Sequence, residues 1–172
     1  MIKENIAKAL SDQVNAEYYS AYLYLIMSSY ADRAGFKGIA NWLFIQAQEE
    51  MAHGTHIYQH ILERGGVPVF ADIKKPEIAL DSIQDVFKKV VAHEEYVTSL
   101  INNIATMALK ENDHASYNFI MWYVNEQIEE EASANEILNK ISFIGDNLSL
   151  LYNLDLELSA RVFTDPFPAV AD

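Results

Sequence analysis

The segment Gln48-Glu49-Glu50-Met51-Ala52-His53 places ionisable side chains inside an apolar pattern. It lies in the stretch 37–64, where apolar residues recur every three or four positions, as on the buried face of a bundle helix. The face that this spacing selects carries Ile39, Leu43, Gln46, Glu50, His53 and Ile57. A carboxylate buried alone costs several kcal/mol, so Glu50 needs compensating groups from other helices.

Three further stretches show the same helical spacing, at 4–34, 81–110 and 114–144. A helix of about 28 residues is roughly 42 Å long, which is typical of a bundle rather than of an average globular helix. A shorter Leu-rich stretch, about 147–160, predicts a fifth helix. The chain has only six Gly and four Pro, which argues against a turn-rich β sandwich or barrel and for long helices.

The connections between these stretches predict the topology. The first and second helices, and likewise the third and fourth, are separated by a few residues, so each pair should be antiparallel. The segment between the second and third helices is long enough to run the whole length of the bundle, since sixteen extended residues reach roughly 50 Å. We therefore expect one all-α domain over 1–172, with the bundle at about 4–144 and a long crossover between parallel second and third helices.

Composition narrows the function classes. The chain has 172 residues, 51% of them apolar, with 12 basic and 25 acidic residues and a net charge of −13. So acidic a chain is a poor partner for nucleic acid or an anionic membrane, and its natural partners are cations. The absence of Cys excludes disulfides and thiolate metal sites. The start lacks a signal-peptide pattern, and we expect a soluble cytoplasmic protein.

Each helical face carries a carboxylate near its middle, and these four are called the central carboxylates: Glu17, Glu50, Glu94 and Glu130. Because each lies near mid-helix, the four should meet at one depth in the bundle, whichever way each helix runs. A single such Glu is more often bent toward solvent or paired with a core cation, but these faces have no Lys or Arg at their centres. Two divalent metals would balance four negative charges. Carboxylates with one imidazole, from His53, suit iron, manganese or zinc.

The segments 48–53 and 119–131, with Glu17, Tyr24 and Glu94 at matching places, resemble bacterial non-haem ferritin over essentially the whole chain. The resemblance implies a ferritin-like four-helix bundle and a hollow shell of two dozen identical subunits. It also implies that Fe²⁺ is oxidised by O₂ or peroxide at a diiron centre and stored inside the shell as ferric mineral. One iron would be held by Glu17, Glu50 and His53.

The second iron would be held by Glu94 and Glu130, with Glu50 bridging the two metals. Gln127 would lie beside it, orienting water or an oxygen species. Gln127-x-x-Glu130 stands where bacterioferritin has Glu and His, so the match is to the non-haem type. Met51 occupies the place of the bacterioferritin haem ligand, but we assign it to packing and expect no haem.

Two more groups of residues are implied by the resemblance. Tyr24 and Trp122 could supply electrons during O₂ reduction. For Tyr24 an equally supported alternative is that it is a core residue that only hydrogen-bonds a ligand carboxylate. Three acids beside the main ligands, called the outer carboxylates, could bind a third iron together with Glu130: Glu49, Glu126 and Glu129. The alternative for them is a solvated acidic surface.

The remaining candidates carry weaker expectations. His56 and His60 lie one helical turn apart, but we do not expect them to bind metal, and His93 should be near the site or in solvent. The start of the fourth helix, at 113–121, could line a three-fold channel, as in related shells. The fifth helix has an apolar face of Leu148, Leu151, Leu154 and Leu158, which we expect to be exposed in a lone subunit.

Two other functions remain open. A diiron oxidase or peroxidase that stores nothing would use the same ligands. Relatives of that kind often carry a Cys-rich electron-transfer domain, and this chain has no Cys. A passive storage subunit would lack an oxidation centre, which the intact ligand set opposes.

Overall fold

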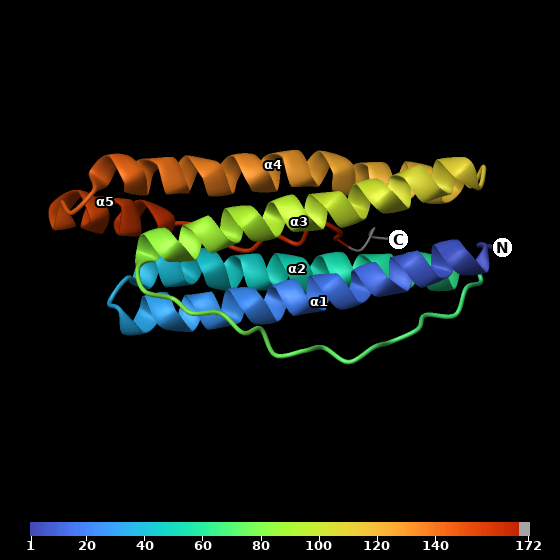
Figure 1. Cartoon of the computed structure of the whole chain (residues 1–172), viewed down its shortest axis with the longest axis horizontal. Coiled ribbons are helices and arrows are strands. Elements are labelled where there is room, and N and C mark those ends of the chain that lie inside the picture. Colours follow the sequence, from blue (N-terminus) through green and yellow to red (C-terminus); the bar gives the residue numbers. More distant parts are fainter. Residues whose placement is uncertain (169–172) are drawn as a thin grey trace.

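The computed structural model describes residues 1–168, which form five helices: α1 (Glu4–Arg33), α2 (Lys37–Glu63), α3 (Ile83–Lys110), α4 (His114–Ile144) and α5 (Leu148–Leu158). The four long helices lie side by side, with α5 packed at one end of the bundle (Figure 1). The predicted all-α bundle with a short fifth helix is confirmed. Among the described residues, no helix combines the length and apolar character that crossing a bilayer requires.

α1, α2 and α4 begin at the predicted residues, and capping residues place the starts of α3 and α5 two and one positions later than predicted. The Ser82 side chain accepts a hydrogen bond from the Asp85 amide at 3.0 Å, so α3 begins at Ile83. Asn147 caps α5 in the same way. Gly145, with φ of 55°, ends α4 in a conformation that glycine adopts at little cost.

The crossover between α2 and α3 spans residues 64–82 and runs along the outside of α1 from one end of the bundle to the other (Figure 1). It is tied to α1 where the Val69 amide donates to the Ser11 hydroxyl at 3.1 Å. The crossover makes α2 and α3 parallel, as predicted. The chain thus consists of two antiparallel helical hairpins, α1/α2 and α3/α4, joined by the long crossover.

Two apolar clusters fill the core. One lies toward the α5 end and includes Met27, Leu43 and Phe87. The other lies toward the opposite end and includes Leu10 and Ile101. Between them is a layer of buried polar side chains, drawn from all four long helices: Glu17, Gln46, Glu50, His53, Glu94, Gln127 and Glu130. The four central carboxylates therefore lie in one layer of the bundle, as predicted from their mid-helix positions.

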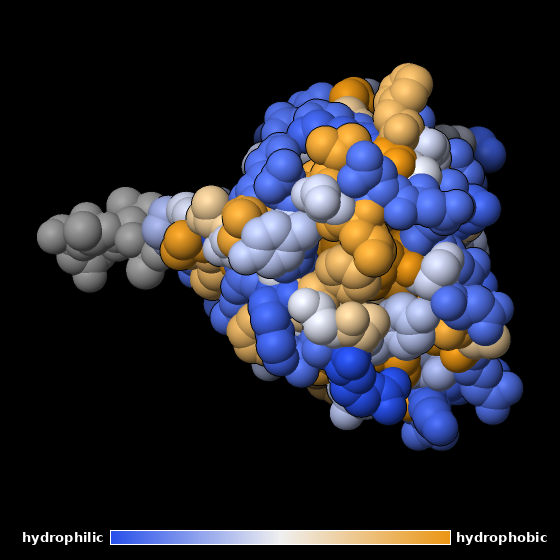
Figure 2. All heavy atoms as spheres, turned by 90° about the vertical axis from the view of Figure 1, so that its left-hand side faces the viewer, coloured by the Kyte–Doolittle hydropathy of each residue, from blue (hydrophilic) through white to orange (hydrophobic). Residues whose placement is uncertain are grey.

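The packing of α5 corrects one expectation. Of the four leucines that we expected to be exposed, Leu154 and Leu158 are buried against the bundle and Leu151 is half-buried, whereas Leu148 is exposed as expected. The helix is apolar on nearly every side, and a second apolar group remains exposed at this end of the molecule (Figure 2): Phe143, Leu148, Leu150, Tyr152 and Leu156.

The position of α5 is fixed at the start of α2. The Ile39 amide donates to the Asp155 carboxylate at 2.8 Å. The two backbones approach so closely at Gly38 that an added Cβ would lie 1.6 Å from the Asp155 carbonyl oxygen. The segment that follows α5 therefore begins at a fixed position beside the start of α2.

Candidate metal centre

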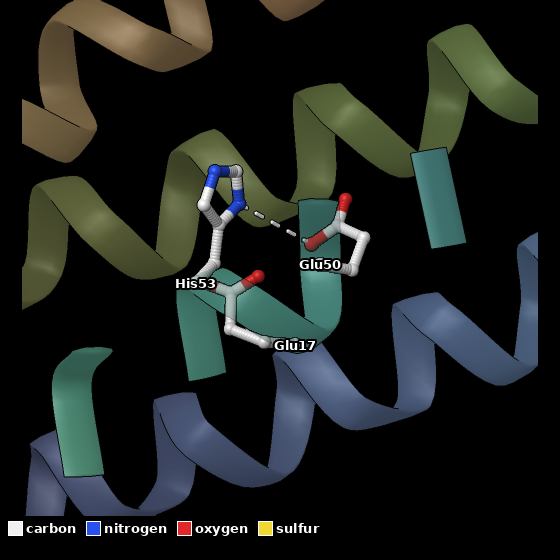
Figure 3. A group of neighbouring side chains, drawn as sticks. All are labelled: Glu17, Glu50 and His53. Atoms are coloured by element: carbon white, nitrogen blue, oxygen red, sulfur yellow. Dashed lines mark ion pairs between the residues drawn. The ribbon is translucent and has the colours of Figure 1, made fainter. Parts of the chain in front are cut away.

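The three ligands expected for the first metal lie together on the first hairpin. Glu17 on α1 and Glu50 and His53 on α2 each offer one ligand atom, and these atoms lie within 4.8 Å of one another (Figure 3). The i, i+3 spacing of Glu50 and His53 puts both on one face of α2, with Nδ1 of His53 3.7 Å from Oε2 of Glu50. In the described part of the chain, Glu50 Oε2 is buried and has no hydrogen-bond partner, and the ring nitrogen of His53 that faces it is Nδ1 (Figure 3). A buried carboxylate oxygen left in this state is one that a bound ion would satisfy.

The second hairpin supplies the other two central carboxylates, already held by hydrogen bonds. Glu94 accepts from the Tyr24 hydroxyl through one oxygen and from the Gln127 amide through the other, at 3.2 Å. Glu130 accepts from the Gln46 amide at 2.8 Å. These donors orient the carboxylates toward the centre of the bundle, as outer partners do for metal ligands generally.

Burial and mutual repulsion raise the pKa values of these acids. Burial, followed by the charge of Glu17, raises the pKa of Glu50 well above its ordinary value. Burial raises the pKa of Glu94 to about 7 and that of Glu130 to about 8. The pKa of His53 is lowered by burial, which favours the neutral imidazole that ligates metals. Without a cation, the centre holds protons that a metal would displace.

Aromatic rings border the centre. The ring of Trp122 lies 5.6 Å from that of His53, and Tyr123 donates its hydroxyl proton to the His53 carbonyl at 3.1 Å. The structure therefore places both Tyr24 and Trp122 at the centre. Whether either supplies an electron stays a prediction.

Several partners of the ligands were not predicted. The Gln13 amide donates to Glu17 at 2.9 Å, a contact that its position one helical turn before Glu17 could have indicated. Gln46 and Tyr123 lie on the same helical faces as the ligands and carried a similar signal. Arg161 lies in the irregular segment after α5, where no periodicity points to it.

The outer carboxylates come from two helices, Glu49 from α2 and Glu126 and Glu129 from α4, and they differ in solvent exposure. Glu49 pairs with Arg161 at 2.5 Å, and its side chain is 17% exposed. Burial raises the pKa values of Glu49 and Glu126, and Glu129 raises that of Glu126 further. Glu129 itself is exposed. Their role as a third site stays a prediction.

The weaker candidates are distributed as follows. His56 stacks on Phe167 with ring centroids 3.6 Å apart, and His60 stacks on Phe119 at 3.7 Å. His93 is not a solvent-facing residue, because its Nε2 lies 2.7 Å from the Ser20 hydroxyl. Met51 is 48% exposed in the subunit, so it does not pack within the core of this chain, and its expected packing role stays a prediction.

Comparison with known proteins places the chain in a family. A model of the ferritin-like domain matches residues 7–144. The bacterial non-heme ferritin of Staphylococcus aureus (strain USA300) is 36% identical over 165 residues, which cover 96% of this chain and 99% of the relative. A probable bacterial non-heme ferritin-like protein of Haemophilus influenzae is 38% identical over 158 residues, covering 92% and 96%.

Solved structures agree with the sequence relatives. An engineered closed form of the Archaeoglobus fulgidus ferritin matches with a TM-score of 0.93 and 46% identity, covering 95% of this chain and 100% of that one. The open-pore ferritin of the same archaeon matches with a TM-score of 0.92 and 45% identity, covering 94% and 98%. The chain therefore belongs to the ferritin family, whose function is iron storage with ferroxidase activity.

Proposed function

We propose that the centre binds two Fe²⁺ ions per subunit and oxidises them before storage. The first iron is held by Glu17, Glu50 and His53, and the second by Glu94 and Glu130, with Glu50 bridging. The observation that carries this assignment is the cluster of ligand atoms from Glu17, Glu50 and His53 within 4.8 Å of one another, in which Glu50 Oε2 is buried and unpartnered, inside a layer with four carboxylates. Two divalent cations neutralise those four charges.

The donor set suits the chemistry. Hard carboxylate oxygens stabilise Fe³⁺ more than Fe²⁺, so binding at this centre favours oxidation. Each Fe²⁺ gives up one electron, and O₂ takes both electrons and two protons to become H₂O₂. Two irons at one centre thus reduce O₂ by two electrons without releasing superoxide. Gln127 lies beside Glu94, where its amide orients the ligand and any water bound to the second iron.

Iron storage requires a hollow shell built from many subunits. The exposed apolar group at the α5 end, which includes Phe143 and Leu148, needs to be covered by other subunits. Ferritin neighbours over nearly the whole chain support a 24-subunit shell, and we place this apolar end at one of its symmetry axes. The same apolar end disfavours the small oxidase or peroxidase that stores nothing. The ligand set disfavours a passive storage subunit.

We also propose that the outer carboxylates bind a third cation, with Glu130 shared between this position and the centre. Glu126 and Glu129 are i, i+3 on α4, and Glu126 and Glu130 are i, i+4, so the three can converge. The half-buried and exposed positions of Glu126 and Glu129 predict weaker and more exchangeable binding than at the centre.

The test is aerobic addition of Fe²⁺ to the purified, metal-free protein, followed by sizing and iron counting. The proposal expects rapid oxidation and many hundreds of irons retained in one large particle. About two irons per subunit in a small oligomer would support the non-storing oxidase. Slow oxidation with iron still retained would support the passive subunit.

A further inference from the structure

The guanidinium of Arg161 contacts one of the outer carboxylates, Glu49. Its Nη2 donates to Oε2 of Glu49 at 2.5 Å, and the two side chains are 27% and 17% exposed. We propose that Arg161 is a built-in counter-ion of Glu49 that competes with a metal cation for this carboxylate. The proposal rests on the third cation position proposed above, and it makes Arg161 the residue that sets how tightly that position binds.

Arg161 is held in place by contacts at both its backbone and its side chain. The Asn41 amide donates to the Arg161 carbonyl at 3.0 Å, and the guanidinium lies 4.8 Å from the centre of the Trp42 ring. The Asp155 cap on α2 fixes the helix that precedes it. Because its position is fixed by packing, Arg161 loses less conformational entropy in pairing with Glu49 than a free surface side chain would.

The pairing is of a kind that a metal can displace. Arg161 holds Glu49 through one nitrogen, and its buried Nη1 has no hydrogen-bond partner in the described part of the chain. A single hydrogen bond is weaker than the two-pronged pairing that Arg makes with a carboxylate at its best. A divalent cation shared by several carboxylates can therefore replace Arg161, but it must do so against a competing charge.

Arg161 also lies next to the centre itself, because its partner Glu49 directly precedes Glu50, the carboxylate proposed to bridge the two metals. Glu130 is the ligand proposed to be shared between the centre and the third position. The Arg161–Glu49 pair thus lies at the junction of the two sites, where it can weaken the third position and leave the first two metals in place.

The test is a calorimetric titration of the metal-free assembled shell with Zn²⁺, which binds without oxidation. In Arg161→Gln, removal of the neighbouring cation should tighten the third binding event roughly tenfold, the scale of one adjacent charge on a carboxylate. The two tighter events should stay unchanged. Arg161→Lys should keep the weak third event, and Arg161→Met should behave like Arg161→Gln while retaining apolar packing on Trp42. Lys8→Gln removes an exposed cation that pairs with Asp12 at 2.6 Å on α1 and serves as the charge-matched control.

A third event of equal or lower affinity in both Arg161→Gln and Arg161→Met would overturn the inference. Two events in every variant would overturn it together with the third position, while the two-metal centre would stand. If the unmodified protein showed no two tight Zn²⁺-binding events, that result would instead contradict the proposed two-metal centre. Light scattering and circular dichroism establish in each case that the shell and its helices are intact.

Discussion

The hydroxyl of Tyr24 on α1 donates a hydrogen bond to the carboxylate of Glu94 on α3, and both side chains are 1% exposed. This bond joins the two hairpins at the depth of the metal centre. Because Gln127 occupies the other oxygen of Glu94, the ligand is oriented before any metal arrives. The contact also lowers the pKa of Glu94, against the larger rise that burial causes.

Tyr24→Phe should therefore weaken metal binding as well as slow oxidation. Without the hydroxyl, the pKa of Glu94 rises further above about 7, and the metal must displace a more tightly held proton. Losing an outer partner of a ligand costs about 10–100-fold, so we expect at least a tenfold slower stopped-flow oxidation near neutral pH. The loss should shrink as the pH is raised.

Tyr22→Phe, at a position on α1 that is 54% exposed, is the matched control and should leave both properties unchanged. If Tyr24 acted only as an electron donor, Zn²⁺ affinity in Tyr24→Phe would equal that of the unmodified protein at every pH. That result would contradict the positioning role.

Glu50→Ala should stop rapid oxidation and leave the shell intact. Glu50 is the carboxylate proposed to contact both metals, and its loss should cost roughly 100-fold or more in rate, beyond the effect of losing an outer partner. The apo protein should not lose stability, because the change removes a buried acid whose Oε2 has no hydrogen-bond partner among the described residues. Oxidation assays with light scattering check both points, with exposed Glu95→Ala as the control. Unchanged kinetics in an assembled Glu50→Ala shell would refute the bridging role.

The stability of the metal-free protein should fall as the pH rises from about 6.5, above which the buried histidines are mostly neutral in the folded and unfolded states alike, to about 8. Glu94 and Glu130 have folded-state pKa values of about 7 and about 8, above their ordinary value of 4.5. Over this range the folded state binds more protons than the unfolded state, so the free energy of unfolding decreases with pH. Added Zn²⁺ replaces those protons, and its stabilising effect should grow over the same range.

Melting temperatures measured across this range, with and without saturating Zn²⁺, test this prediction. Glu94→Gln should flatten the pH dependence of the metal-free protein, and Glu95→Gln should not. A melting temperature that Zn²⁺ leaves unchanged at the upper end of the range would count against a closed layer of carboxylates.

Replacing all three outer carboxylates with Ala should spare the two tight metals and alter later turnover. Glu49, Glu126 and Glu129 are proposed to hold only the third cation, which passes iron or electrons between the centre and the cavity. The variant should change the ratio of iron oxidised to O₂ consumed. Anomalous diffraction from iron-soaked crystals gives the direct measurement, and two peaks per subunit under excess iron in the unmodified protein would defeat the third site.

Gly38→Ala should loosen α5. The added methyl group would lie 1.6 Å from the Asp155 carbonyl oxygen, so the backbones must separate. Overpacking of this kind costs about 1–3 kcal/mol, and assembly at the α5 end should weaken with it. Gly54→Ala, also within α2, meets the Tyr18 ring rather than backbone and should leave α5 and shell assembly unaffected. Thermal melts and light scattering compare the two variants, which should differ in particle size if the prediction is right.

The sequence could predict the centre because its ligands lie on periodic helical faces. Glu17, Glu50, Glu94 and Glu130 each fall near mid-helix, and antiparallel packing brings mid-helix positions to a common depth whatever the details of the loops. Arg161 could not be found in this way, because it follows α5 in a segment without a repeating pattern.

The orientation of α5 marks a second limit of pattern reading. Leu154 faces the bundle and Leu150 faces outward, yet both are leucines in a helix that is apolar on nearly all sides. Composition cannot then select the buried face. The choice is made by the close contact at Gly38 and by the Asp155 bond to Ile39, which join parts of the chain more than 100 residues apart.

The crossover at 64–82 has a consequence for how the protein folds. Each hairpin is stabilised by contacts between helices that adjoin in sequence, and such local contacts form faster than distant ones. The first hairpin carries Glu17, Glu50 and His53, and the second carries Glu94 and Glu130. Neither hairpin alone encloses a pair of metals, and the acids of one repel those of the other as they approach. The final docking of the hairpins is therefore the step that brings all five proposed metal ligands together. Protons or metal ions must be taken up before this docking can be completed.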